Sequence, residues 1–137
     1  MAGYSGTPLP KKLGFKPGST VLIRQAPADF AALLEPLPDD VVLVDEIDSP
    51  VSVIVAFYTA HECLATDFPR LRNSLAANGR LWIACPKRAS KRPTDLDEDN
   101  IRDLGLATGL VDVKVCAIDE VWSGLCFMFR KADRPRT

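Results

Sequence analysis

The stretch Val51–Pro86 (VSVIVAFYTAHECLATDFPRLRNSLAANGRLWIACP) decides the fold of this 137-residue chain. It contains an apolar run, Val53–Tyr58, then a segment whose apolar residues recur at helical spacing, and then a second apolar run, Leu81–Cys85. Strands that are apolar on both faces are typical of parallel sheets covered by helices on each side. The stretch therefore predicts a β-α-β unit of an α/β domain.

Local signals predict where the helix of this unit begins and ends. Thr59-x-x-Glu62 matches a capping box, so we expect the helix to begin there. Pro69 is expected to kink the helix or to divide it in two. Asn78-Gly79 is expected to end it, because these residues adopt left-handed backbone conformations readily.

The flanking sequence extends the same alternation of strands and helices. Upstream, we expect a strand at Thr20–Arg24, a helix carrying Phe30 to Leu37, and a strand at Val41–Val44 that is covered on both faces. Downstream, we expect a helix capped by Asp95-x-x-Glu98. Two alternating runs around Trp122-Ser123-Gly124, Val111–Val115 and Leu125–Phe129, are expected to form an antiparallel hairpin.

These elements predict a three-layer sandwich, with a mostly parallel, doubly wound sheet of about six strands and an antiparallel C-terminal hairpin. Only a few residues, around Ile47–Pro50, separate two predicted strands, which is too short for a helical crossover. We expect residues 1–18 to form an N-terminal cap segment, 19–130 a single Rossmann-like domain, and 131–137 a disordered tail.

Composition excludes several classes of function. The formal net charge of −1 gives no general attraction to nucleic acid or to anionic membranes. No apolar run has the roughly 20 residues that a membrane helix needs, and the first residues do not resemble a secretory signal, so a cytoplasmic location is expected. The four cysteines occur singly. Neither a disulfide framework nor a metal site is therefore expected, although His61-x-Cys63 is a metal-like pair.

Two resemblances follow from these residues. The chain from Thr20 to Arg130 resembles a reduced class I S-adenosylmethionine-dependent methyltransferase, through Asn78–Trp82, the helix end at Gly109-Leu110 and the closing hairpin. The whole chain resembles a family of small bacterial proteins of unknown function. The matching stretches are Tyr4–Leu9, Pro86-Lys87, Thr94–Leu96, Gly109–Val115 and Asp119–Gly124. These resemblances imply the fold, and the second assigns no activity.

The first strand-to-helix turn departs from a cofactor-binding pattern. It reads Arg24-Gln25-Ala26-Pro27, where a dinucleotide or S-adenosyl cofactor needs glycines that let backbone amides approach it. Pro27 has no N–H, and the side chains of Gln25 and Ala26 occupy space near the expected ligand. We therefore expect no cofactor, with S-adenosylmethionine as the one that the resemblance would allow.

Ligands of open α/β sheets bind beyond the carboxyl ends of the strands. The candidate ligand-binding residues in that crevice are Gln25, Asp45, Tyr58, Thr59, Pro86, Lys87 and Lys91. Asp45 would bond a ribose in a methyltransferase, or is simply a solvated acid at a strand end. The loop Lys87–Arg92 carries four cations, which either bind a phosphate or carboxylate or balance the acids that follow.

No catalytic residue is assigned. His61 would serve as a general base or is a surface histidine, and Cys85 is a reactive thiol or a buried one. Trp122 is a core residue or an exposed aromatic at a binding or dimer surface.

The leading functional hypothesis is a non-catalytic or regulatory methyltransferase-like domain that binds a small anionic ligand. The alternatives are a methyltransferase with an atypical first turn, and an assembly module. Specific binding of nucleic acid or membrane is not expected. The strand ending at Asp45 is expected at an edge of the sheet, and a homo-oligomer is expected through it, because its apolar residues carry no charge or proline to block pairing.

Overall fold

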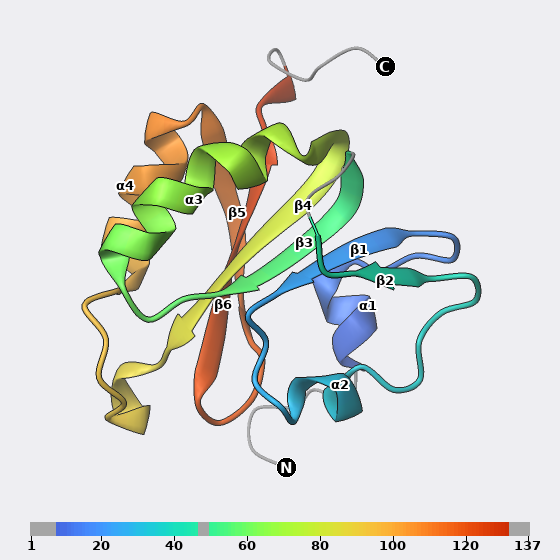
Figure 1. Cartoon of the computed structure of the whole chain (residues 1–137), viewed down its shortest axis with the longest axis horizontal. Helices are drawn as coiled ribbons and strands as arrows, with labels where there is room; N and C mark the ends of the chain where they lie inside the picture. The colour runs from blue at the N-terminus through green and yellow to red at the C-terminus, as the bar shows by residue number, and fades with distance from the viewer. Residues whose placement is uncertain (1–7, 47–49, 132–137) are drawn as a thin grey trace.

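A computed structural model describes residues 8–46 and 50–131 of the chain, and both predicted layers of helices lie against a six-stranded sheet (Figure 1). The helices are α1 (Leu9–Leu13), α2 (Phe30–Leu33), α3 (His61–Asn73) and α4 (Glu98–Ala107), with a 3-10 turn, η1, at Arg88–Ser90. The strands are β1 (Thr20–Arg24), β2 (Val42–Val44), β3 (Val51–Phe57), β4 (Leu75–Pro86), β5 (Leu110–Ala117) and β6 (Trp122–Phe129).

The strand order is β2-β1-β3-β4-β6-β5. Strands β1 to β4 pair in parallel, whereas β6 is antiparallel to both β4 and β5. The predicted fold class is therefore confirmed, including the antiparallel C-terminal hairpin. Strand order reverses between β1 and β3, because β2 lies on one side of β1 and β3 lies on the other.

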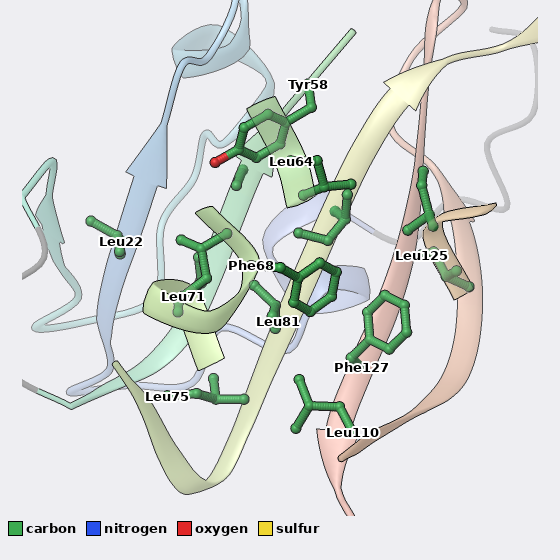
Figure 2. Close-up of a cluster of buried hydrophobic side chains, with 14 of the residues drawn as sticks. Leu22, Tyr58, Leu64, Phe68, Leu71, Leu75, Leu81, Leu110, Leu125 and Phe127 are labelled. Atoms are coloured by element: carbon green, nitrogen blue, oxygen red, sulfur yellow. The ribbon is translucent and has the colours of Figure 1, made fainter. Parts of the chain in front are cut away.

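The two faces of the sheet bury two separate apolar clusters. On one face, α3 and α4 cover a cluster in which the Phe68 and Phe127 rings pack edge to face, 5.4 Å apart (Figure 2). On the other face, α1 and α2 cover a cluster that includes Leu13, Phe30 and Trp82. The indole of Trp82, which is fully buried, donates a hydrogen bond of 2.8 Å to the Leu13 carbonyl and so ties α1 to the centre of the sheet.

Strand β2 corrects one expectation and confirms another. Predicted to be covered on both faces, it leaves Val42 54% exposed and Leu43 43% exposed. The expectation of burial is wrong because α2 has only four residues and does not extend over β2, although Phe30 to Leu37 had predicted a longer helix. The strand does lie at an edge of the sheet, as expected.

The ends of α3 also differ from the sequence prediction. Ala60, not Thr59, is the N-cap, and its side chain cannot cap, so the predicted capping box is absent. The helix contains Pro69 without being divided, and Ser74 ends it. Asn78-Gly79 lies instead within β4, where the pairing with β3 shifts register. Tertiary pairing with β3 overrides the local turn signal of these two residues.

The N-cap of α4 is Asp97 rather than Asp95. Its carboxylate accepts a hydrogen bond of 2.8 Å from the Asn100 amide, and the Asn100 side chain accepts one from the Asp97 amide. This is a reciprocal capping box. Asp95 instead accepts a hydrogen bond from the His61 amide at the start of α3. Residues 1–7 of the predicted cap segment and residues 132–137 of the predicted tail lie outside the described residues.

We predict that the open edge of β2 supports self-association. Exposed apolar side chains and unpaired backbone groups at a sheet edge favour pairing with another strand. Leu43→Lys should therefore lower the apparent mass at high micromolar concentration in size-exclusion chromatography with light scattering. Lys91→Gln, which changes charge far from this edge in sequence, serves as the control. A strictly monomeric parent protein would refute the prediction.

Candidate functional site

The switch point between β1 and β3 is bridged by a hydrogen bond within the chain. Gln25, directly after β1, has a φ of 58°, in the left-handed region that favours glycine. Its side-chain amide donates a hydrogen bond of 3.0 Å to the Phe57 carbonyl at the end of β3. The side chain of Gln25 thus joins the two strand ends between which a doubly wound fold binds its ligand.

Side chains on both faces of β3 fill the space around this bridge. On one face, the Phe57 ring packs against Phe30 (centroids 4.8 Å apart) and Trp122 (5.1 Å). Trp122 therefore packs onto the core cluster, as the core interpretation proposed. On the other face, the buried Tyr58 hydroxyl donates a hydrogen bond of 2.6 Å to Asp67. Burial, reinforced by Asp67, raises the Tyr58 pKa, so this phenol stays protonated.

Two of the predicted residues line a shallow hollow beside the switch point. Gln25 and Asp45 both border this hollow of about 590 Å³, at the carboxyl ends of β1 and β2. Pro27 and Phe30 also line it, together with apolar side chains of β1, α2 and β2. Asp45 is exposed there, which fits either of the interpretations that the sequence left open.

A second hollow, of about 640 Å³, lies beyond the carboxyl end of β4, and its volume is in the range of small-molecule sites. Its floor is formed by buried apolar side chains: Ile83 and Leu125 of the sheet, Ile101 of α4, and Leu96 of the loop before α4. Its rim carries charged side chains from the loop between β4 and α4 and from the first residue of α4. They are Lys87, Arg88, Arg92, Asp95, Asp97 and Glu98. We call this hollow the β4 pocket.

The loop that forms the rim, residues 87–97, is tied down at both ends. The Lys87 amide donates to the Val121 carbonyl at 2.6 Å, which holds the start of the loop against the β5–β6 connection. Near the other end, the Thr94 hydroxyl donates to the Thr59 carbonyl at 2.6 Å. In Figure 1 this loop (gold) continues from the tip of β4 to the start of α4.

Asp95 performs the role that the sequence had assigned to Thr59. Its carboxylate accepts a hydrogen bond of 2.7 Å from the His61 amide, the first N–H of α3. A carboxylate at a helix N-terminus satisfies an otherwise unpaired amide and interacts favourably with the helix dipole. The cap of α3 is therefore supplied by a residue 34 positions away in sequence, which no local motif could reveal.

The acids and the cations of the β4 pocket differ in their partners. Asp95 caps α3, Asp97 caps α4, and Glu98 accepts from Arg102 at 2.8 Å. By contrast, Lys87, Arg88 and Arg92 form no ion pair with any residue among 8–46 and 50–131. The acids are neutralised in part by local contacts, whereas the cations remain available to a ligand.

The sulfur in the β4 pocket is unsuited to nucleophilic chemistry. Burial, with a smaller contribution from Asp97 and Glu98, raises the pKa of the Cys85 thiol to about 11. A thiol must ionise to act as a nucleophile, so Cys85 is inert near neutral pH. His61 does not border the pocket, and the described residues contain no cluster of three or more His, Cys, Asp or Glu side chains that could hold a metal.

The seven predicted ligand-binding residues do not gather in a single crevice. Gln25 and Asp45 border the hollow beside the switch point, and Pro86 and Lys87 border the β4 pocket. Tyr58 and Thr59 border neither, since Tyr58 is buried and Thr59 anchors the rim loop through its carbonyl. Lys91 is exposed outside the pocket, with a left-handed φ of 58° at the end of η1.

Several lining residues were absent from the predicted set. Arg88 and Arg92 belong to the cationic run that the sequence had identified, and they, rather than Lys91, face the pocket. Ser123 and Gly124 enter it from β6, because β6 pairs with the end of β4. The cationic run was a usable signal, whereas the pairing of β6 with β4 was not visible locally.

Comparison with solved structures assigns the fold. A SAM-dependent methyltransferase from Aquifex aeolicus matches with a TM-score of 0.58 at 16% identity, over 88% of this chain and 87% of that one. Magnesium protoporphyrin IX methyltransferase from Synechocystis PCC 6803, with bound SAH, matches with 0.59 at 10% identity, over 83% and 75%. The O-methyltransferase NcsB1, in complex with SAM and a naphthoic acid, matches with 0.61 at 11%, over 82% and 49%.

The chain has a class I methyltransferase-like fold. No family model matches its sequence. No curated protein matches it either. At these identities the likeness concerns the fold, and function must be argued from the residues of this chain.

The first turn of this methyltransferase-like domain does not fit an S-adenosyl cofactor. The Gln25 bridge to Phe57 spans the ends of β1 and β3, and Pro27 offers no N–H. The helix that follows, α2, has only four residues, so it provides little dipole to support a charged ligand.

We predict a fixed order of thiol modification. Cys63 is exposed, whereas Cys85 and Cys126 are buried with pKa values raised to about 11 and about 12, chiefly by burial. At pH 8 iodoacetamide should therefore alkylate Cys63 first, as mapped by peptide mass spectrometry. In denaturant, the control, all four cysteines should react. Alkylation of Cys85 in the folded protein as fast as that of Cys63 would contradict the described pocket.

No helix among the described residues is long and apolar enough to span a bilayer.

Proposed function

We propose that this protein is a ligand-binding domain that uses a methyltransferase-like fold without transferring methyl groups, and that its ligand is a small organic anion held in the β4 pocket. The proposal rests on one observation. Three cations at the rim of the pocket form no ion pair with described residues, while the three acids beside them cap helices or pair with Arg102.

The floor of the pocket suggests the class of anion. Ile83, Leu96 and Leu125 are apolar and nearly fully buried, so the deep part of the pocket offers no charge to a ligand. A ligand that fills this space would place an apolar body over these side chains and a carboxylate or phosphate against Arg88 and Arg92. Guanidinium groups bind both kinds of anion bidentately.

A non-catalytic role is consistent with the chemistry of the lining. Cys85 is held protonated, and no histidine borders the pocket. A domain that binds an anion and transmits this binding to neighbouring elements of the fold needs neither a nucleophile nor a general base. The rim loop contacts both the β5–β6 connection and the start of α3, so a ligand that orders the loop would act on both.

We predict that benzoate, which joins one carboxylate to a flat apolar body, raises the melting temperature more than benzyl alcohol, its neutral analogue. The double variant Arg88→Gln/Arg92→Gln should bind benzoate at least tenfold more weakly, because both guanidinium partners are removed. Lys91→Gln is the matched control, since Lys91 belongs to the same loop but lies outside the pocket.

Calorimetry at constant ionic strength measures the affinities. Equal benzoate binding by the double variant and its parent would refute the site. Equal effects of benzoate and benzyl alcohol would show that only the apolar floor binds.

A methyltransferase is the second candidate, favoured by the fold and by the position of Asp45 beside Gln25 in the hollow at the ends of β1 and β2. The closed first turn argues against it. If the protein bound the cofactor, a concentration of 100 times the dissociation constant would raise the free energy of unfolding by about 2.7 kcal/mol.

We predict that neither S-adenosylmethionine nor S-adenosylhomocysteine raises the melting temperature or gives binding heat in calorimetry. The variant Gln25→Gly tests the reason, because glycine adopts the same backbone conformation without the bridging side chain. Binding gained only by this variant would attribute the exclusion to the bridge. Binding by the parent protein would favour the methyltransferase and overturn our proposal.

A further inference from the structure

A third hollow lies at the opposite end of the strands from the β4 pocket. It has a volume of about 620 Å³ and is bordered by the turn after α1, the start of β3 and the irregular start of β4. The residues that border it with charged or polar side chains are Lys16, Ser19, Ser52, Asn78 and Arg80. We call it the amino-end pocket.

The register of β4 creates this space. Leu75 pairs with Val51, but the next pairing joins Arg80 to Val53, so four residues of β4, 76–79, have no regular partner in β3. Three of these four, Ala76, Ala77 and Gly79, are small, and all three line the pocket. The irregular segment therefore leaves room for a ligand.

Arg80 is held at this pocket by packing. A Cβ atom placed on Gly14 would lie 2.7 Å from Cδ and 2.9 Å from Nε of Arg80, so the arginine stem crosses directly over this glycine. Gly14 also has a φ of 88°, which ends α1 in a left-handed conformation. Glycine at this position thus permits both the end of α1 and the position of Arg80.

The guanidinium of Arg80 forms no hydrogen bond or ion pair with any residue that the structure describes. Arginine side chains that are ordered by packing are usually paired, because five N–H donors need acceptors. A pre-positioned guanidinium beside an open pocket is therefore suited to an anion.

Lys16 supplies a second positive charge from a rigid turn. Its backbone amide donates to the Ser19 hydroxyl at 3.0 Å, and the Ser19 amide donates back to the Lys16 carbonyl at 3.0 Å. Ser19 is buried, which fixes the turn that carries Lys16. Among the described residues, no acidic side chain lines the amino-end pocket, in contrast to the three acids of the β4 pocket.

We propose that the amino-end pocket binds a terminal phosphate group, with Arg80 and Lys16 as its charge partners. Two cations match the charge of about −1.5 to −2 that a phosphate monoester carries at pH 7. Arg80 can donate two parallel hydrogen bonds to phosphate oxygens, and Ser52 and Asn78 border the same space with further donors. A phosphate diester, with one negative charge, leaves one of the two cations unmatched.

The test uses amide chemical shifts of the full chain in NMR, titrated with inorganic phosphate, methyl phosphate or dimethyl phosphate at constant ionic strength. Inorganic phosphate and methyl phosphate should give saturable shifts at Gly14, Ser19 and Gly79. Dimethyl phosphate should bind at least tenfold more weakly. The location of the shifts separates this site from the β4 pocket, where Lys87, Leu96 and Ser123 report.

Two variants test the cations. Arg80→Gln keeps most of the stem over Gly14 but removes the charge, and it should weaken methyl phosphate at least tenfold, as should Lys16→Gln. Lys11→Gln is the control, since it removes the same charge from an exposed side chain of α1 that does not line the pocket.

An unchanged affinity in Arg80→Gln, or the absence of saturable shifts at Gly14 and Ser19, would overturn the site. Arg80 would then serve only to cover the end of α1. Equal binding of dimethyl phosphate would overturn the assignment to a terminal phosphate. Benzoate binding at the β4 pocket is independent of all these outcomes.

Discussion

The pairing of β4 between β3 and β6 is the constraint on which the rest of the structure depends. β4 is parallel to β3 on one side and antiparallel to β6 on the other, and both of its faces are buried from Leu81 to Ala84. Apolar surface removed from water contributes about 25 cal/mol per Å², so a strand buried on both faces stabilises the sheet more than an edge strand such as β2. Both candidate pockets lie at the ends of this strand.

The antiparallel partner of β4 determines what borders its carboxyl end. Because β6 runs in the opposite direction, its first residues, Trp122 to Gly124, lie beside Ala84 to Pro86. The connection from β5 thereby comes within hydrogen-bonding distance of Lys87 and holds the rim loop. In a fully parallel sheet the carboxyl end of β4 would meet the carboxyl end of its neighbour instead, and this wall of the pocket would be absent.

In this protein the methyltransferase-like fold occurs with a first turn, Arg24-Gln25-Ala26-Pro27, that lacks the glycines of a cofactor-binding turn. At this turn, Gln25 joins the ends of β1 and β3 through a side-chain hydrogen bond to the Phe57 carbonyl. The three cations that form no ion pair with described residues lie elsewhere, at the carboxyl end of β4. Function in such a fold therefore follows from the residues at each strand end rather than from the fold.

The sequence by itself determined the strands, their mostly parallel arrangement and the cationic run at Lys87–Arg92, since apolar periodicity and charge are local properties of the chain. Local motifs failed where distant residues compete for the same backbone groups. Asp95 caps α3 instead of Thr59, and Asn78-Gly79 joins β4 instead of ending α3. Only the tertiary structure decided that Arg88 and Arg92 face the β4 pocket while Lys91 does not, because the left-handed backbone at Lys91 ends η1 outside that pocket. It alone also placed Arg80 over Gly14, a contact between residues 66 positions apart that depends on how α1 packs against the sheet.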